Sequence, residues 1–452
     1  MRIRSWIPYA VALSLAACGQ PQTTPAGPGA SLPAGAGISV PAEASRHPIE
    51  FILASFRPHG DGARPRGALA LGPYGSLFGT TSRGGRLGCP AGRGRCGSVF
   101  TLANTDSGLI EFSLYQFCKL SGCADGGLPY AGVTFDGNHA MYGTTYEGGA
   151  HGSGVVFKLT YGHRENNERV LYSFCAQANC ADGSNPRSTP IFDKRGAFYG
   201  TTLYGGSKNG GVVFKLTPSS SGYTESVLHA FSGTDGLYPE AGVVADASGA
   251  LYGTTASGGM TGCDTGCGVV YKLTPSSSGY TESVLHEFGS GSDGTDPYAG
   301  LVMDKHGNLF GVTAMGGGTG CGGYGCGVVF ELKRTGTTYS ESVLHAFDGT
   351  DGEGSDAALA FGNHGELYGT TGGGGTSGEG TVFAMRPAHS SYGFHSVYNF
   401  CTRKKCIDGA TPLGGIFFGA KALYGVTGLF GTTSQGGYDG GGTVFEVEEP
   451  NR

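Results

Sequence analysis

Short apolar runs alternate along most of this chain with stretches of Gly, Asp, Asn, Pro and Ser. The runs are rich in Val, Phe, Tyr and Leu, which fit a pleated sheet, and beyond the first twenty residues none shows a convincing helical period. The 88 glycines agree with this, because glycine is costly inside helices and favoured where φ must be positive. The pattern predicts an all-β chain.

One phrase, Tyr-Gly-Thr-Thr followed by a Gly-Gly pair, recurs with small changes at intervals of about 59 residues. Repeats of this length that contain several strands indicate a propeller or an array. The seven copies are Phe78–Thr81, Tyr142–Thr145, Tyr199–Thr202, Tyr252–Thr255, Phe310–Thr313, Tyr368–Thr371 and Phe430–Thr433.

Each repeat predicts four strands. In the copy that begins at Tyr298, the expected strands a, b, c and d are 299–304, 309–313, 327–332 and 341–347. Seven such units predict a seven-bladed β-propeller of four-stranded blades.

The two ends of the repeat region predict how the ring closes. Residues 49–56 match a strand d, and residues 442–449 match a strand c. The last blade, which begins near Leu413, is therefore expected to take its outermost strand from residues 49–56, so that no sheet edge stays open. A spare "LYGVT" at 423–427 leaves the register of residues 413–433 open, as either an insertion or a shifted strand.

The first 47 residues read as an export signal and a tether. Arg2 and Arg4 precede a short apolar stretch that ends in Leu-Ala-Ala-Cys at Cys18. This ending resembles the lipobox of bacterial lipoproteins, which implies lipidation of Cys18 and removal of residues 1–17; an ordinary secretory signal is the alternative. Residues 18–47 then form a Pro/Gly/Ala-rich tether with a reach of about 30 Å, and residues 48–449 form the propeller.

The cysteines and the charge support export. Apart from Cys18, the cysteines form six close pairs, which in an exported protein indicate disulfides, and none has the C-x2-C spacing of most zinc knuckles. Each bridge closes a short segment and is expected to staple a loop. The net charge of −6, which becomes −8 without the signal, argues against nucleic acid as a partner. The pairs are Cys89/Cys96, Cys118/Cys123, Cys175/Cys180, Cys263/Cys267, Cys321/Cys326 and Cys401/Cys406.

These motifs resemble the bacterial GloVer tandem repeats, also called "choice-of-anchor" proteins, over roughly residues 50–449. The resemblance implies a membrane or surface anchor, here the lipid at Cys18, and no established activity. The order "AGLVxDxxGNLYGTT" is also similar to NHL-type propellers, which implies that strand a is innermost. By the sorting rule of some diderm bacteria, Gly19 implies the outer membrane.

With strand a innermost, the b–c loops, the d-to-a crossovers and all six cysteine pairs share one face. An Asp-Gly in every crossover suggests a ring of carboxylates that could bind Ca²⁺ or sugar hydroxyls, although Asp-Gly is more typical of a turn. The Thr pairs could line the channel or bond neighbouring strands. Tyr130, Tyr238 and Tyr298 could stack on a sugar or pack on a blade edge. The aspartates are Asp61, Asp125, Asp182, Asp235, Asp293, Asp351 and Asp408.

Several function classes are excluded. Trp6 is the sole tryptophan, so propellers with recurring Trp do not fit, and no G-x-S-x-G, H-E-x-x-H or P-loop is present. His229, His286 and His345 fall on the outer strands of different blades, so no metal site is expected.

The preferred hypothesis is a monomeric, anchored binding or scaffolding module for an envelope protein or glycan. The alternatives are an enzyme acting on polysaccharide or a lactone-like molecule, and a structural surface layer. Unlike acidic, His or Arg residues gathered in one pocket would favour the enzyme.

Overall fold

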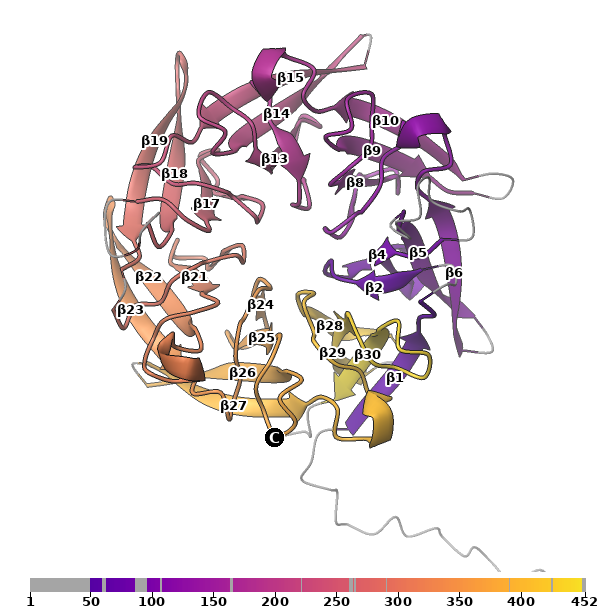
Figure 1. Ribbon diagram of the computed structural model, residues 1–452. Helices are drawn as coiled ribbons and strands as arrows, with labels where there is room; N and C mark the ends of the chain where they lie inside the picture. Colours follow the sequence, from indigo (N-terminus) through magenta and orange to yellow (C-terminus); the bar gives the residue numbers. More distant parts are fainter. Residues whose placement is uncertain are drawn as a thin grey trace, which may run out of the picture. The chain divides into compact units, whose positions relative to one another are not determined.

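The computed structural model describes residues 49–448 except 59–61, 86–95, 106–107, 163–165, 221, 260–262, 264–265, 290, 390 and 424–425. Seven antiparallel sheets stand around a common axis in these residues (Figure 1). This confirms the predicted seven-bladed β-propeller. Cys18 and the residues expected to form the signal and the tether lie outside the described residues.

Each blade runs outward from strand a to strand d, which confirms that strand a is innermost; strand a has two residues in every blade except blade seven. Strands a are β3 (Ala70–Leu71), β7 (Thr134–Phe135), β12 (Ile191–Phe192), β16 (Val244–Ala245), β20 (Val302–Met303), β24 (Ala360–Phe361) and β28 (Phe417–Leu423). Strands b are β4 (Leu77–Arg83), β8 (Met141–Thr145), β13 (Phe198–Tyr204), β17 (Leu251–Thr255), β21 (Leu309–Val312), β25 (Leu367–Thr371) and β29 (Val426–Thr433). We number the blades one to seven in this order.

The outer half of each blade is a long hairpin. Strands c are β5 (Ser98–Thr105), β9 (Val155–Thr160), β14 (Val212–Ser219), β18 (Val269–Ser276), β22 (Val328–Thr335), β26 (Thr381–Ala388) and β30 (Thr443–Glu448). Strands d are β6 (Gly108–Gln116), β10 (Asn167–Ser173), β15 (Gly222–Ala230), β19 (Gly279–Glu287), β23 (Thr338–Ala346), β27 (Ser391–Asn399) and, for blade seven, β1 (Ile49–Ser55).

Small elements complete the ring. Two extra strands, β2 (Ala63–Pro65) and β11 (Ser184–Pro186), pair with β4 and β13. The short 3-10 helices are η1 (Pro73–Gly75), η3 (Ser121–Cys123), η4 (Ala178–Cys180), η5 (Cys321–Gly323) and η6 (Lys404–Cys406). No helix among the described residues has the length and apolar character needed to span a membrane.

The N-terminal strand closes the ring as predicted. Strand β1 pairs antiparallel with β30, from Ile49 opposite Glu448 to Ser55 opposite Thr443. Sequence-distant ends of the chain thus share blade seven, and β30 has a partner on each side.

The open register of blade seven resolves as an insertion. Phe417 pairs with Phe430, thirteen residues away, whereas Val302 pairs with Phe310 only eight residues away in blade five. The second phrase, 429–433, therefore holds the strand b position, and the spare copy lengthens the a–b hairpin.

The core consists of seven buried apolar clusters in the described residues, one between each pair of neighbouring blades. In every interface a buried Phe just after strand d meets an aromatic ring on strand c of the next blade, edge to face. Such pairs contribute about 0.5–1.5 kcal/mol each beyond their burial. The centroids lie 4.9–5.2 Å apart in Phe56–Phe100, Phe117–Phe157, Phe174–Phe214, Phe231–Tyr271, Phe288–Phe330, Phe347–Phe383 and Phe400–Phe445.

The same strand c ring explains the glycine of the repeated phrase. A Cβ added to Gly200 would lie 2.7 Å from the Phe214 ring, and the equivalent glycine of every blade is covered in the same way. Any side chain here would push the ring out of the blade interface.

Candidate functional site

The crossover aspartates are turn-forming residues. Asp182 is fully buried; it accepts hydrogen bonds from the backbone N–H of Ala176 and Gln177 and from the Tyr172 hydroxyl at 2.8 Å. Asp125 and Asp408 are also fully buried and have the same kinds of partner. A buried carboxylate with its oxygens already bonded does not face a ligand, so the hypothesis of a ligand-facing ring is wrong for these three.

The other described aspartates pair with histidine. The Oδ2 atoms of Asp235, Asp293 and Asp351 lie 2.8, 3.3 and 2.7 Å from Nε2 of His229, His286 and His345, respectively. Each His thus orders the crossover of its own blade. The described residues hold no group of three His, Cys, Asp or Glu side chains that could bind a metal ion. Asp61 lies outside the described residues.

A glutamate of the next blade's strand d lies beside each of five crossover aspartates. In the first such pair, the Tyr115 hydroxyl lies 2.9 Å from Oδ2 of Asp125 and 3.5 Å from Oε2 of Glu168. Burial and then the nearby aspartate charge raise the pKa of Glu168 to about 7. The blade interfaces therefore carry carboxyl pairs at their outer rim, namely Asp125/Glu168, Asp182/Glu225, Asp235/Glu282, Asp293/Glu341 and Asp408/Glu50.

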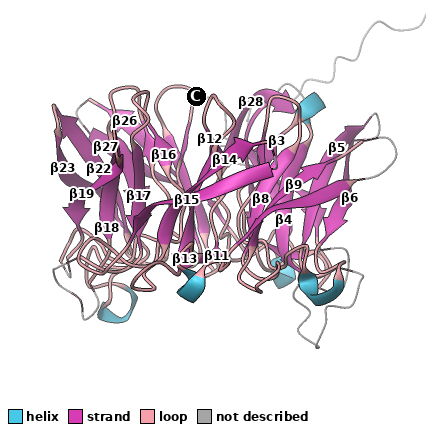
Figure 2. Cartoon of the chain, turned by 90° about the horizontal axis from the view of Figure 1, so that it is seen from above, coloured by secondary structure: helices cyan, strands magenta, loops and turns pink. Residues whose placement is uncertain are grey.

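Five predicted disulfides are formed, and Cys96 is also disulfide-bonded, while Cys89 lies outside the described residues. The short helices of the cysteine-bearing loops lie on the lower face in Figure 2. The disulfides indicate an extracytoplasmic protein, because such bonds persist in oxidising compartments. The five described pairs are Cys118/Cys123, Cys175/Cys180, Cys263/Cys267, Cys321/Cys326 and Cys401/Cys406.

The bridges close short loops, with sequence separations of 4 and 5 residues for Cys263–Cys267 and Cys321–Cys326, and these two bridges also reach the core through Cys267 and Cys326. Both side chains are buried, with exposed fractions of 1% and 0%, and each belongs to an apolar cluster between two blades. The physical reason is their place in the chain: one glycine separates each cysteine from the buried start of a strand c, at Val269 in β18 and at Val328 in β22. These two bridges therefore tie a b–c loop to the core of a blade interface.

The Thr pair of the phrase bonds strands and loops. The second Thr donates to the carbonyl two residues on; Thr202, for example, donates to Tyr204. The first Thr donates across the interface to the next blade; the Thr201 hydroxyl lies 2.7 Å from the Ala241 carbonyl oxygen. Blade five has Val312 at this position. The cross-blade bonds are Thr80 to Ala131, Thr144 to Ser188, Thr201 to Ala241, Thr254 to Ala299, Thr370 to Gly414 and Thr432 to Gly67.

Replacing Thr201 with Val should lower the free energy of unfolding by about 0.5–1.5 kcal/mol, because the bond from this buried hydroxyl to the partly buried carbonyl of Ala241 is lost while the side-chain shape is kept. Urea unfolding measures the change. Thr217→Val, at an exposed position on β14, is the matched control and should be neutral. Equal effects at the two positions would contradict the role assigned to Thr201.

The carbonyl that accepts each cross-blade bond belongs to the residue directly after a channel-facing residue, and we call this channel-facing position X. The residue two positions before X has a φ between 53° and 64°, and in six repeats the residue directly before X is a proline. The proline packs on a glycine of the preceding blade, as Pro186 does on Gly154. Ser355 replaces the proline in blade six and donates to the Thr370 carbonyl. The seven X residues are Arg66, Tyr130, Arg187, Glu240, Tyr298, Asp356 and Leu413.

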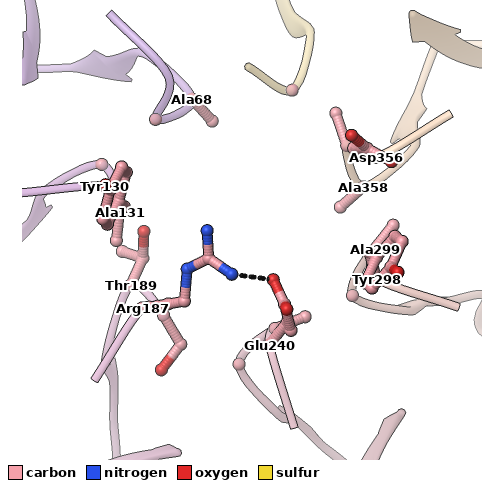
Figure 3. A pocket seen from close by; sticks show the side chains of 18 of the residues that line it. Ala68, Tyr130, Ala131, Arg187, Thr189, Glu240, Tyr298, Ala299, Asp356 and Ala358 are labelled. Carbon is pink, nitrogen blue, oxygen red and sulfur yellow. Dashed lines mark hydrogen bonds and ion pairs between the residues drawn. The ribbon is translucent and has the colours of Figure 1, made fainter. Parts of the chain in front are cut away.

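All seven X residues line one pocket of about 510 Å³ in the channel. The crossovers lead directly to X, so the pocket lies toward the face that carries the disulfide loops. Small residues between X and strand a, such as Ala68, Ala131 and Ala299, also line it (Figure 3). The volume is that of a site for a small molecule.

The charges of the X residues are divided by blade. Arg66 and Arg187 lie on either side of the Tyr130 ring, with guanidinium carbons 5.3 and 5.0 Å from its centroid. Glu240 and Asp356 flank Tyr298 in the ring order, and Leu413 completes it. Blades one to three thus supply Arg-Tyr-Arg, and blades four to six supply Glu-Tyr-Asp.

One ion pair joins the two halves. The Arg187 guanidinium projects into the pocket and binds the Glu240 carboxylate (Figure 3). Burial raises the pKa of Glu240, and Arg187 opposes this shift. Asp356 is open to the solvent of the channel, yet the surrounding protein and then the Glu240 charge raise its pKa to about 6. Burial lowers the pKa of Arg66, and the charges of Arg187, Arg64 and Arg83 act in the same direction.

Two of the X residues, Tyr130 and Tyr298, were expected from sequence as candidates to stack on a sugar, and both line the pocket. The third, Tyr238, has a positive φ, and its ring contacts Tyr204. Arg66, Arg187, Glu240 and Asp356 were missed. Their signal is a single column of the aligned repeats, just after the crossover proline, where the residue type changes from blade to blade.

A known repeat family matches the middle part of this chain. Residues 169–323 match the model of the Gloeobacter/Verrucomicrobia repeat. No curated protein matches the chain. The match covers strand d of blade two to the b–c loop of blade five, so this part of the β-propeller carries the repeat.

Two solved structures are similar in fold. One is a candidate oxidoreductase (glucose dehydrogenase) from Thermus thermophilus, with 14% identity and a TM-score of 0.43 over 70% of this chain and 95% of that one. The other is a candidate 6-phosphogluconolactonase from Bacteroides uniformis, with 11% identity and a TM-score of 0.46 over 79% of this chain and 92% of that one. At these values neither likeness bears on what this chain does.

Proposed function

We propose that this protein is a lipoprotein anchored through Cys18, whose propeller binds a small polar ligand of the cell envelope, such as the end of a glycan or peptide, in the pocket formed by the X residues. The lipobox, the tether and the disulfides support the location. Gly19 favours the outer membrane in a diderm host.

The asymmetry of the X residues carries this proposal. Residues that serve the fold recur in every blade, as the edge-to-face rings and the glycines under them do. The X residues include basic, acidic, aromatic and apolar types, although a proline precedes X in six of the seven blades. Charge and aromatic variety at a position that the fold holds constant is what a binding site for one asymmetric ligand requires.

A second candidate function is an enzyme on polysaccharide or a lactone-like molecule, and Asp356 favours it. A carboxyl group with a pKa of about 6, close to a second carboxylate, can give and accept a proton near neutral pH. In this case Asp356 would act on the bound ligand, and Asp356→Asn would abolish turnover while binding persists.

Thermal-shift screening of the full-length protein in detergent tests the binding function. The panel contains neutral, acidic and amino sugars, amino acids and short peptides. At 100 times its Kd, a ligand stabilises the folded state by about 2.7 kcal/mol, which gives a clear rise in melting temperature. Arg187→Ala and Glu240→Gln should abolish the rise, and Lys194→Ala, at an exposed site, should keep it. A panel without a hit, or a rise that both pocket variants keep, would refute the proposal.

A further inference from the structure

Two charged groups in the pocket have no partner. Arg187 and Glu240 neutralise each other, whereas Arg66 and Asp356 make no hydrogen bond or ion pair with any described residue. Nε of Arg66 is buried and unbonded, although its guanidinium stacks on Tyr130. A buried donor without an acceptor is unfavourable, so a ligand that supplies an acceptor to this guanidinium gains affinity.

The charges that act on Arg66 and on Asp356 are different. Arg64, Arg83 and Arg187 add positive charge around Arg66. Of the charges that act on Asp356, that of Glu240 has the largest effect and opposes ionisation, whereas Arg66 and Arg187 favour ionisation. Because neither group has a hydrogen bond or ion pair with a described residue, each can still bind a ligand group of opposite charge.

Blade seven lies between the two groups in the ring, and its X residue is Leu413 beside Gly415. Neither of these described lining residues carries a charge that could satisfy Arg66 or Asp356. With two arginines and two acids, the X residues have no net charge when ionised. A simple anion would satisfy Arg66 and be repelled by Asp356, and a simple cation would do the reverse.

We propose that the pocket binds a zwitterion, a molecule whose carboxylate pairs with Arg66 and whose ammonium group pairs with Asp356. The ligand crosses the apolar sector of Leu413, and the Tyr130 and Tyr298 rings offer walls for its uncharged part. A volume of about 510 Å³ admits a molecule of short-peptide size. This inference rests on the proposed binding function and names its ligand class.

Calorimetric titration of the full-length protein with glycine, diglycine and triglycine tests the inference. At least one of them should bind, and the best length reports the span between the two charges. Its amide, which lacks the carboxylate, and its N-acetyl form, which lacks the ammonium group, should each bind at least tenfold more weakly, as expected for a charge-assisted contact.

The variants assign each charge to its residue. In Arg66→Ala the amide should bind as well as the free peptide, while the N-acetyl form stays weaker. In Asp356→Asn the pattern should be reversed. Arg66→Lys should retain part of the preference for a carboxylate, and Arg169→Ala, an exposed arginine on β10, should behave as wild type. Melting temperatures show that each variant is folded.

Three results would overturn the inference. The first is that glycine, diglycine and triglycine all fail to bind, and the second is that the capped forms bind as tightly as the free form. The third is that Arg66→Ala and Asp356→Asn weaken the binding of the amide and of the N-acetyl form to the same extent. If a sugar of the screening panel binds in an Arg187-dependent way while the zwitterions do not, the proposed binding function stands and the ligand class is wrong. If nothing in either experiment binds, both are wrong.

Discussion

Raising the pH from 5 to 9 is expected to lower the melting temperature of the protein by roughly 5 °C. The carboxyl pairs at the rims of the blade interfaces cause this. Burial raises the pKa of each of these glutamates from 4.5 to about 7, and the charge of a nearby aspartate adds to the shift. For Glu50, the Arg403 charge lowers the pKa, and its effect is larger than that of the aspartate. In four of them one carboxyl oxygen is buried without a hydrogen-bond partner, namely in Glu168, Glu225, Glu282 and Glu341.

The direction of the change in stability with pH follows from the pKa of each glutamate in the unfolded and in the folded protein. A glutamic acid that holds its proton more tightly when folded contributes stability that is fully present below pH 4.5 and is lost as the pH rises through about 7. Because four of these side chains are partly open to solvent and Arg403 opposes the shift of the buried Glu50, we take the contribution of each as about 1 kcal/mol rather than the full value of the shift. Five such groups together amount to several kcal/mol.

Calorimetric melting curves between pH 5 and pH 9 measure the loss. Glu282→Gln should melt close to wild type at pH 5 and above it at pH 9, because the amide carries no charge to bury beside Asp235. Glu353→Gln, at an exposed position, should follow the wild-type curve. A melting temperature that stays constant or rises over this range would show that the pairs do not hold protons in the folded protein.

Deleting residues 49–55 is expected to open the ring. Strand β1 is the outermost strand of blade seven, and Phe56 directly after it stacks on Phe100 of blade one at 5.0 Å. Without β1, the edge of β30 is unpaired, and the apolar cluster between blades seven and one loses the side chains of β1 that pack on it. An unpaired strand edge is a template for association, so we expect self-association and a melting temperature lower by 10 °C or more, as an estimate of roughly 8 kcal/mol lost.

Size-exclusion chromatography and melting curves test this, with a deletion of the seven tether residues 27–33 as the control of equal length. The control should remain monomeric and melt as wild type. A β1 deletion that stays monomeric with an unchanged melting temperature would mean that β1 does not stabilise the closed ring.

The repeats predict the architecture well, because each copy carries the same local signals. Blade count, strand order and ring closure follow from the period and from the phase of the two chain ends, and the structure confirms them. The register of blade seven did not follow from sequence, since two copies of the phrase compete for one strand position. Only pairing with Phe417 shows that the copy at 429–433 is strand b.

The pocket was harder to predict for a physical reason. Motifs that recur attract attention, and in this ring they maintain the fold: Asp182 orders a crossover, Thr201 joins two blades and Gly200 makes room for Phe214. The site consists of what does not recur. Arg66 and Asp356 are far apart in the chain, and only closure of the ring brings their blades to either side of blade seven.

In six blades the proline directly before X packs on a glycine of the preceding blade, and this contact does not involve the X side chain. The scaffold therefore tolerates any residue at X that the channel can hold, and the recognition chemistry can be changed one blade at a time. Seven such positions on one ring form a combinatorial surface, so relatives built from the same repeat can diverge in ligand while the proline contacts between blades are kept, and a designer can reassign the pocket by the same route.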